Sequence, residues 1–430
     1  MPKQAYRKRR PCDKRAQPAA ELPREVQLLL DPAELTRILQ EEVRNFATEV
    51  GLKVALQLLE HEVTERCGAK HERSGPRELY RHGHQSGSIT IAGQKLPVSK
   101  PRMRKADGSG EVELARYADL QNPAAMPEAC LRRMVRGVST RDYEAVIDRG
   151  LAGFGVQRSS VSRGFVKASA KEIAVLAERK LDHDRFVAIF IDGKEFAGEM
   201  MIVALGITAK GQKQVLGLRQ GGTENAEVVT SLLANLVERG LDSSRPTLFV
   251  LDGAKALSAA VKRVFGKHAL IQRCQVHKLR NVQAHLPEKH HAQLVTQLSA
   301  AYHETSYGAA LGQLQTTLKW VERLSPNAAA SLREGLEETL TVVKLGLPEL
   351  LRRTLATTNP IESALSVVGK VTGRVKRWRD GDMRLRWCTA GLLRAEQKFN
   401  RVRGHKQLHL LVSQLDVLDT KTIDAEQKSA

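Results

Sequence analysis

The chain has 430 residues, of which 42% are hydrophobic, and its 68 lysines and arginines against 48 acidic residues leave a net charge of +20. This length allows two or more domains with sizeable cores, and the charge favours a polyanionic partner, nucleic acid before an anionic membrane. The sequence argues against a membrane protein, because no apolar run reaches about 20 residues and no signal-peptide core follows the basic N-terminus, and five scattered cysteines predict a reducing cytoplasm rather than a disulfide framework.

The first 65 residues are predicted to form a basic arm followed by helices. Residues 1–20 carry seven lysines and arginines against one aspartate, a pattern typical both of a solubilising tail and of an arm that touches DNA. From Pro32 to about Val63 the apolar residues recur at helical spacing, and Asp31 is placed to cap that helix.

Residues 66–115 change from a polar, turn-rich stretch to an alternating pattern that predicts a hairpin turning near Gly93. One interpretation is a zinc site, although the paired Cys-x-x-Cys spacing of most zinc modules is missing. Its ligands would be Cys67, His71, His82 and His84. We favour a small basic β-ribbon that lies near phosphates, with cations at Lys100, Arg102, Arg104 and Lys105.

Residues 116–182 show three amphipathic pieces joined by glycine-containing turns, with Ser139 placed to cap the second and Ser159 or Ser160 the third. A short second helix, a turn and a third helix that starts with small polar residues fit a helix-turn-helix. The residues facing the DNA groove would be Gln157, Arg158, Ser160 and Arg163. An ordinary helical connector is the alternative.

Two short apolar runs each end in an Asp-Gly pair: one at 186–191 stops at Asp192, and one at 247–251 stops at Asp252. Both runs are rich in β-branched and aromatic residues, which indicates buried strands. If the two strands are neighbours in one sheet, their ends bring two carboxylates together, and binding a divalent cation relieves the repulsion. Asp-Gly is also a strong hairpin signal, so each aspartate taken alone is equally well explained as a turn residue.

The region 183–284 is predicted to be the first part of an α/β domain with a mixed sheet. Two apolar runs after 186–191 indicate a three-stranded antiparallel unit, and two helices then alternate with strands at 247–251 and ALIQRC. After His277 the chain shows only helical patterns to about Arg353, and the helix opened by TTNPIE then returns it to the sheet domain. Three segments therefore complete the chain: an all-α insertion (285–350), the rest of the sheet domain (351–415) and a tail (416–430).

Glu362 and the pair Cys274–His277 are further candidates whose spacing also has a structural explanation. In TTNPIES, Asn359 is placed as an N-cap and Pro360 at the first helical position, so that Glu362 closes a capping-box arrangement. Cys274 and His277 form a Cys-x-x-His at the end of a strand. Without a second such pair the zinc interpretation is weak, and a buried thiol beside a polar histidine is simpler.

The segment GKVTGRVKRWRDGDMRLRW combines cations with aromatic side chains. Cations that hold phosphates beside aromatic faces that stack on bases make a nucleic-acid surface, and a solvated basic helix is the alternative. The aromatic residues are Trp378 and Trp387. The cations are Lys370, Arg374, Lys376, Arg377, Arg379, Arg384 and Arg386.

Four motifs, in this order, resemble the Mutator-type family of bacterial insertion-sequence transposases: DGKEF at Asp192, VLDGAKAL at Asp252, QRCQVHKLRNV at Cys274 and His277, and TTNPIES at Glu362. The resemblance covers roughly residues 66–400 and includes RELYRHGH before the β-ribbon. QRCQVHKLRNV after an Asp-Gly strand is its most specific part.

The resemblance implies an RNase H-like core of the Asp-Asp-Glu kind, interrupted by the helical insertion. The catalytic and metal-binding triad would be Asp192, Asp252 and Glu362, with Mg²⁺ or Mn²⁺ as cofactor, and Cys274 and His277 would be the family's signature pair. Two ions about 3.5–4 Å apart can activate a water or a 3′-hydroxyl and stabilise the leaving oxygen. We expect Asp192 to bridge both ions while the other two acids each hold one.

The implied function is that of a transposase which binds the terminal inverted repeats of its element, cuts them and joins them to target DNA. We expect a cytoplasmic, nucleoid-associated homodimer on DNA. Trp320 in the insertion would lie near the cut site, unless it is a core residue. No basic residue follows Glu362 until Lys370, a departure from the family pattern that leaves open which cation positions the scissile phosphate. The alternatives are a domesticated DNA-binding regulator and an RNase H-like nuclease without strand transfer.

Overall fold

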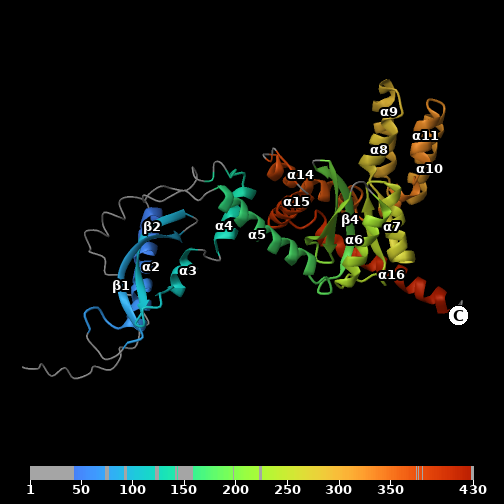
Figure 1. Ribbon diagram of the computed structural model, residues 1–430. Helices are drawn as coiled ribbons and strands as arrows, with labels where there is room; N and C mark the ends of the chain where they lie inside the picture. Colours follow the sequence, from blue (N-terminus) through green and yellow to red (C-terminus); the bar gives the residue numbers. More distant parts are fainter. Residues whose placement is uncertain are drawn as a thin grey trace, which may run out of the picture. The chain divides into compact units, whose positions relative to one another are not determined.

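The computed structural model describes residues 43–427, with gaps at 73–76, 92–93, 122–124, 141–142, 144–157, 197, 222–224, 374, 376 and 380. The predicted basic arm, the cap at Asp31, the turn at Gly93, most of the second helix of the helix-turn-helix, Gln157, Arg374 and Lys376 lie outside the described residues. The described chain forms two compact units, residues 43–121 and residues 125–427 (Figure 1). Within these ranges no helix is both long and apolar enough to cross a membrane.

The first unit is a pair of helices packed against an antiparallel sheet. Its elements are α2 (Val43–Cys67), β1 (Leu79–Ile91), β2 (Gln94–Lys105), β3 (Glu111–Val112) and α3 (Ala115–Gln121). The two long strands pair from Leu79 with Lys105 to Ile91 with Gln94, which confirms the predicted hairpin. The apolar side of α2 packs on alternate strand positions, and the core includes Leu59, Val63, Ile89, Leu96 and Met103. Helix α2 continues to Cys67, four residues past its predicted end.

The first unit offers no support for the zinc interpretation. Cys67 is buried in the core, whereas His82 and His84 are exposed on β1. Burial raises the pKa of the Cys67 thiol, against the charges of nearby arginines, so the thiol stays protonated. Among the residues that the structure describes, no three His, Cys, Asp or Glu side chains are gathered to hold a metal ion.

The second unit is built on a five-stranded mixed sheet in the order β6-β5-β4-β7-β8. The three-stranded antiparallel part predicted from the sequence is confirmed, and β7 and β8 run parallel to β4. The strands are β4 (Phe186–Phe196), β5 (Glu199–Thr208), β6 (Lys213–Gly221), β7 (Thr247–Leu251) and β8 (Ala269–Arg273). The central strand is apolar on both faces because helices cover both.

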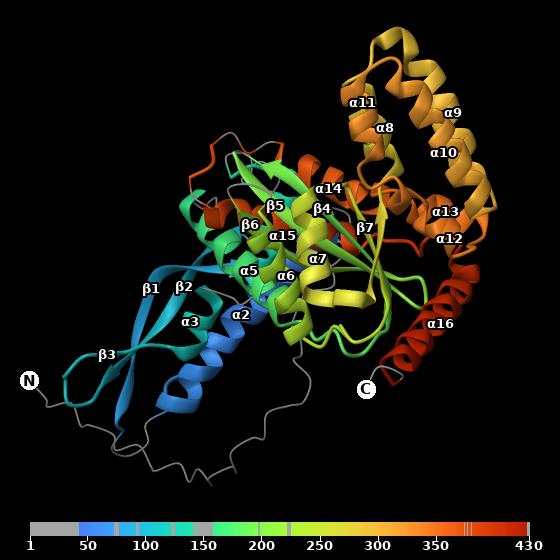
Figure 2. The same ribbon diagram turned by 90° about the vertical axis from the view of Figure 1, so that its right-hand side faces the viewer.

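Helices lie on the two faces of this sheet in two groups (Figure 2). On one face, α6 (Ala226–Glu238) and α7 (Lys255–Phe265) pack on Ile189, Ile191 and Phe249. On the other, Phe190 and Val250 belong to a core that contains residues of six helices. These are α5 (Arg158–Glu178), α12 (Thr341–Lys344), α13 (Glu349–Leu355), α14 (Asn359–Thr372), α15 (Gly381–Glu396) and α16 (Leu408–Gln427). Helix α4 (Ala125–Val135) packs on α5, where the Gly164 position comes close to the Cys130 sulfur.

The predicted insertion is helical throughout, with its own core of leucine and alanine side chains. Its helices are α9 (His291–His303), α10 (Tyr307–Glu322), α11 (Pro326–Arg333) and α12 (Thr341–Lys344). Helix α8 (Gln275–Gln283), which precedes the predicted boundary at residue 285, packs in the same core through Val282, and Figures 1 and 2 both show α8–α11 extending from one end of the sheet. The short 3-10 helices of this unit are Gly266–His268, Glu288–His290, Glu337–Leu340 and His405–Gln407.

The insertion returns along the outer edge of β8 and satisfies its polar groups. The Gln272 amide donates to Thr339 O at 2.8 Å and accepts from Val342 N at 2.9 Å, and the Thr341 hydroxyl donates to Ile271 O at 2.6 Å. An unprotected edge strand would invite pairing with another chain. The insertion therefore covers this edge of the sheet through the backbone of Thr339 and Val342 and the hydroxyl of Thr341.

Candidate active site

Three neighbouring parallel strands are in register at the level where β7 and β8 end, and β4 continues past this level to Phe196. Ile191 of β4 pairs with Leu251 of β7, and Leu251 pairs with Arg273 of β8. The next residue on each strand is therefore Asp192, Asp252 or Cys274. Parallel neighbours lie about 4.8 Å apart, so the three residues occupy one short row at the sheet edge. The Cys274 amide donates to Leu251 O at 2.7 Å, which carries the strand pairing into this row.

Strand alternation puts both aspartates on the face of the sheet that α14 covers. Phe190 and Val250 lie two residues before the aspartates and belong to the core beneath that helix, and side chains two apart on a strand share a face. Asp192 is only 7% exposed. Asp252 is half-buried, and its Oδ1 accepts the amide proton of Ala254 at 2.8 Å, which fixes the turn after the strand.

Glu362 lies in the first turn of α14, directly after Ile361, which is buried in the same core. The predicted capping box is wrong. The helix begins at Asn359, so Thr358 holds the cap position without a side-chain cap bond, and Glu362 falls one position later than expected. Its carboxylate instead accepts a hydrogen bond from the Thr358 hydroxyl at 3.0 Å and lies 3.6 Å from His277 Nε2.

The Cys-x-x-His pair is electrostatically coupled to the acids. A hydrogen bond with Cys274 and, after it, the charges of Cys274, Asp192 and Asp252 together raise the pKa of His277 to about 9, against the effect of burial. The buried Cys274 thiol has a lowered pKa, because burial, which raises it, is outweighed by hydrogen bonds from His277 and Thr358. Glu362 lies 3.6 Å from this histidine, and both aspartates act on it through their charge.

The structure thus brings the three predicted acids and the signature pair to one edge of the sheet. Carboxylate oxygens are the ligands that Mg²⁺ and Mn²⁺ prefer, so this donor set suits such an ion. The carboxylate of Glu362 contacts Thr358 and His277, and within the described ranges no three acidic, His or Cys side chains form a closed metal cluster. The chemistry of the donors fits a divalent cation, with Asp192, Asp252 and Glu362 as the residues that would hold it.

The predicted DNA-contacting cations lie outside this cluster. Arg158 and Arg163 are exposed at the start of α5, and the Arg163 guanidinium lies 3.2 Å from Ser160 Oγ. Helix α5 begins one residue before the predicted caps. Lys370 is exposed near the end of α14. Of the basic segment after it, the described residues include exposed Arg377 and Arg379 with half-buried Trp378 between them.

Two tryptophans, Trp387 and Trp320, pack against other side chains of the protein. Trp387 is 6% exposed, and its ring packs on Phe165 of α5 with centroids 4.5 Å apart, so the expectation that it forms part of a DNA surface is wrong. Trp320 packs at the margin of the insertion core, with its ring edge-on to His290 at 6.0 Å. The Trp320 side chain is therefore partly buried.

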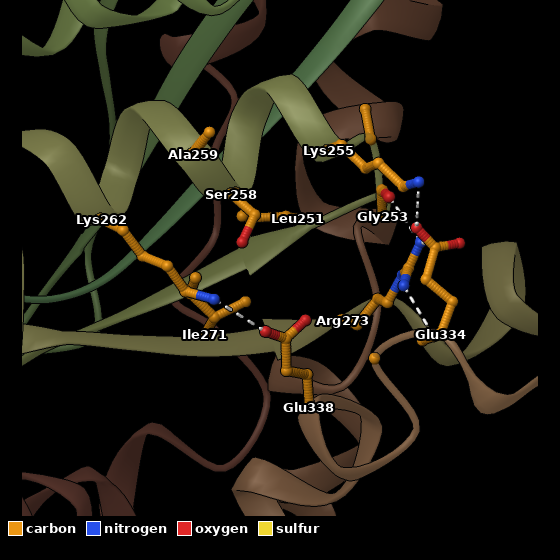
Figure 3. Close-up of a pocket in the computed structure, with 12 residues that line it drawn as sticks. Leu251, Gly253, Lys255, Ser258, Ala259, Lys262, Ile271, Arg273, Glu334 and Glu338 are labelled. Atoms are coloured by element: carbon orange, nitrogen blue, oxygen red, sulfur yellow. Dashed lines mark hydrogen bonds and ion pairs between the residues drawn. The ribbon is translucent and has the colours of Figure 1, made fainter.

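Sequence reasoning did not identify Thr358 or the charged residues where α7 faces the insertion. A cavity of about 340 Å³ lies between α7 and the insertion, on the sheet face opposite the aspartates (Figure 3). Its charges are paired with one another: Lys262 with Glu338 at 3.2 Å, and Lys255 with Glu334 at 3.6 Å. Such pairing indicates that these ion pairs connect α7 to the insertion and do not form a ligand site. A threonine directly before the Asn-Pro pair was the available signal for Thr358.

Comparison with known sequences gives a consistent result. A family model described as "Transposase, Mutator family" matches residues 24–379. The transposase for insertion sequence element ISRM5 of Rhizobium meliloti is 30% identical over 381 residues, which cover 84% of this chain and 93% of that protein. The transposase for IS256 in transposon Tn4001 of Staphylococcus aureus is 28% identical over 62% of this chain and 68% of its own length. The transposase for IS1081 of Mycobacterium tuberculosis is 24% identical over 80% and 83%.

Proposed function

This chain belongs to the Mutator family of transposases, and from that premise we propose that it cuts the ends of an insertion sequence and joins them to target DNA, with Asp192, Asp252 and Glu362 as its catalytic carboxylates. One observation carries the proposal. Asp192 and Asp252 are neighbours on adjacent parallel strands in register, where β7 ends, and the first turn of α14 brings Glu362 within 3.6 Å of His277, whose pKa both aspartates raise.

Each part of the site has a separate task in this proposal. The register of β4 and β7 holds Asp192 and Asp252 side by side on the sheet, and α14 supplies the third acid from the layer that covers it. A divalent cation held by these three residues would activate a water or a 3′-hydroxyl and stabilise the leaving oxygen of the same phosphodiester. The low exposure of Asp192 limits access of bulk water to the site.

The β-ribbon of the first unit has the charge that DNA attracts. Strands β1 and β2 contain six lysines and arginines and no acidic residue. Arg81 is paired with Glu60, Arg102 with Glu111, and Lys100 lies over the Tyr117 ring. Exposed Arg104 lies across the ladder from Tyr80, which is 50% exposed. A two-stranded ribbon fits the major groove, so we infer that this face contacts the element ends.

Substitution of the three acids tests the catalytic assignment. Asp192→Asn, Asp252→Asn and Glu362→Gln should each abolish Mg²⁺-dependent cleavage of DNA that carries the element ends, and each should bind those ends with near-normal affinity, since the DNA-contacting surfaces are untouched. Asp242→Asn is a matched control, because this aspartate lies in the loop before β7, at the opposite end of the strand from Asp252. Cleavage by any of the three variants, or loss of binding with cleavage per bound end intact, would refute the assignment.

A further inference from the structure

Thr358 is a buried polar residue at the junction of the two halves of the site. It is 0% exposed and stands immediately before α14. A threonine at a helix start normally turns its hydroxyl to the amide protons of the first turn. The Thr358 hydroxyl makes no such bond. Its hydroxyl is therefore engaged elsewhere.

The polar groups around Thr358 belong to the Cys-x-x-His pair and to Glu362. The Thr358 amide and hydroxyl each lie 3.4 Å from Cys274 Sγ. The hydroxyl also lies 3.2 Å from His277 Nδ1 and 3.0 Å from Glu362 Oε1. A hydroxyl donates one hydrogen bond and accepts two. The single hydroxyl proton can be donated to Glu362 Oε1 or to Cys274 Sγ, and the oxygen can accept from His277 Nδ1, so this one group links the Cys-x-x-His pair to Glu362.

The backbone around this junction fixes the position of the hydroxyl. Gln275, the residue after Cys274, donates its amide proton to Ala356 O at 3.0 Å, so the end of β8 is joined to the segment that leads into α14. Ile361 and Glu362 donate their amide protons to Thr358 O, both at 3.0 Å. The hydroxyl thus belongs to a frame that links the strand end to the helix start.

We propose that Thr358 is a positioning residue that couples the Cys-x-x-His pair to Glu362 and holds this carboxylate at the edge where Asp192 and Asp252 end. The inference rests on the proposed catalytic role of Glu362. The Glu362 side chain is 33% exposed, so a carboxylate without the threonine bond is free to turn toward water. Groups that hydrogen-bond a metal-binding carboxylate commonly change metal affinity or activity 10- to 100-fold when they are removed.

Thr358→Val and Thr358→Ser in the full chain test the proposal. Valine has nearly the same shape but no hydroxyl, and serine keeps the hydroxyl. Binding of Mn²⁺ to the DNA-free protein is measured by electron paramagnetic resonance, and the Mn²⁺ concentration for half-maximal end cleavage is measured separately. We expect roughly a 10- to 100-fold weaker Mn²⁺ affinity and a matching rise in the half-maximal concentration for Thr358→Val. Thr358→Ser should stay close to wild type.

Two controls separate positioning from folding and from the catalytic assignment. A purely structural role would lower the melting temperature and the active fraction without moving the Mn²⁺ midpoint, and that result overturns the proposal. Thr358→Ala is the second variant if valine prevents folding, since it removes the hydroxyl without a new methyl group against Cys274. If Glu362→Gln cleaves normally, the proposed function fails. If Glu362→Gln is inactive while Thr358→Val binds Mn²⁺ like wild type, only the positioning role fails.

Discussion

Replacing the two tryptophans of the basic segment separates a core role from a DNA-contacting one. Trp387 is 6% exposed and packs on Phe165, whereas Trp378 is half-buried between two exposed arginines. Truncating a buried tryptophan removes its transfer energy and leaves a cavity, at a cost of about 3–5 kcal/mol. For a unit of this size each kcal/mol corresponds to roughly 2–4 °C. Trp387→Ala should therefore lower the melting temperature by roughly 10 °C.

The matched variant is Trp378→Ala, which should leave the melting temperature unchanged. If its ring stacks on a base, its loss weakens DNA binding by about 1–3 kcal/mol, or roughly 5- to 100-fold. Differential scanning fluorimetry gives the melting temperature, and fluorescence anisotropy with labelled element-end DNA gives the affinity. Trp387→Phe keeps an aromatic ring beside Phe165 and serves as the conservative control. A Trp387→Phe protein with normal stability and DNA binding weakened tenfold or more would refute the core assignment.

Three further predictions concern buried titratable groups. Burial raises the pKa of Glu172 from 4.5 to about 6, so the fold loses stability as pH rises through that range. The loss is about 1 kcal/mol once solvent screening of this half-buried side chain is allowed for. Glu172→Gln should recover most of this loss in thermal unfolding at pH 7.5 and little at pH 4.5. The pKa of His277 is raised from 6.5 to about 9, chiefly by its hydrogen bond with Cys274, so its contribution to stability is complete below pH 6.5 and is lost as pH rises through about 9; His277→Gln should unfold with a flatter pH dependence between pH 6.5 and 9.5. Burial lowers the pKa of Lys278 to about 8, although its ammonium group donates to the carbonyls of Ser331 and Glu334. Lys278→Met should leave those carbonyls unpaired, at a cost of about 1–3 kcal/mol. Hydrogen exchange in α11 should then be faster than in the wild type, and unchanged exchange would contradict the prediction.

The parts of the fold that follow from local pattern were predictable from the sequence. The apolar run before Asp252 predicted β7 to the residue, because a buried strand in a covered sheet is apolar on both faces. The run before Asp192 predicted the start of β4 correctly, but that strand continues five residues past its predicted end, to Phe196, so Asp192 lies within the strand and not after it. The antiparallel unit and the helical insertion followed for the same reason. The strand order places the two aspartates side by side. The sequence alone could not establish that these two strands are neighbours, so it predicted the pairing of the aspartates only for the case that they are.

The errors came from contacts between segments far apart in the chain. Nothing near Trp387 in the sequence reveals that Phe165 lies against its ring, more than 200 residues earlier along the chain. The capping box around Glu362 failed because Thr358 is engaged by Cys274 and His277, both about 80 residues away, and the helix started one residue early. Local propensity describes a helix start correctly only when no distant group competes for its cap.

The register between β4 and β7, which pairs Ile191 with Leu251, makes the number of residues before each aspartate important for function. Side chains on a strand alternate between faces, so deleting one residue between Thr247 and Leu251 would turn the carboxylate of Asp252 toward α7 and away from α14. The loop from Leu241 to Pro246 leads into the other end of β7 and could change length without that effect. Insertions and deletions should therefore occur in such loops. The number of residues in β4 before Asp192 and in β7 before Asp252 should stay constant wherever the site is used.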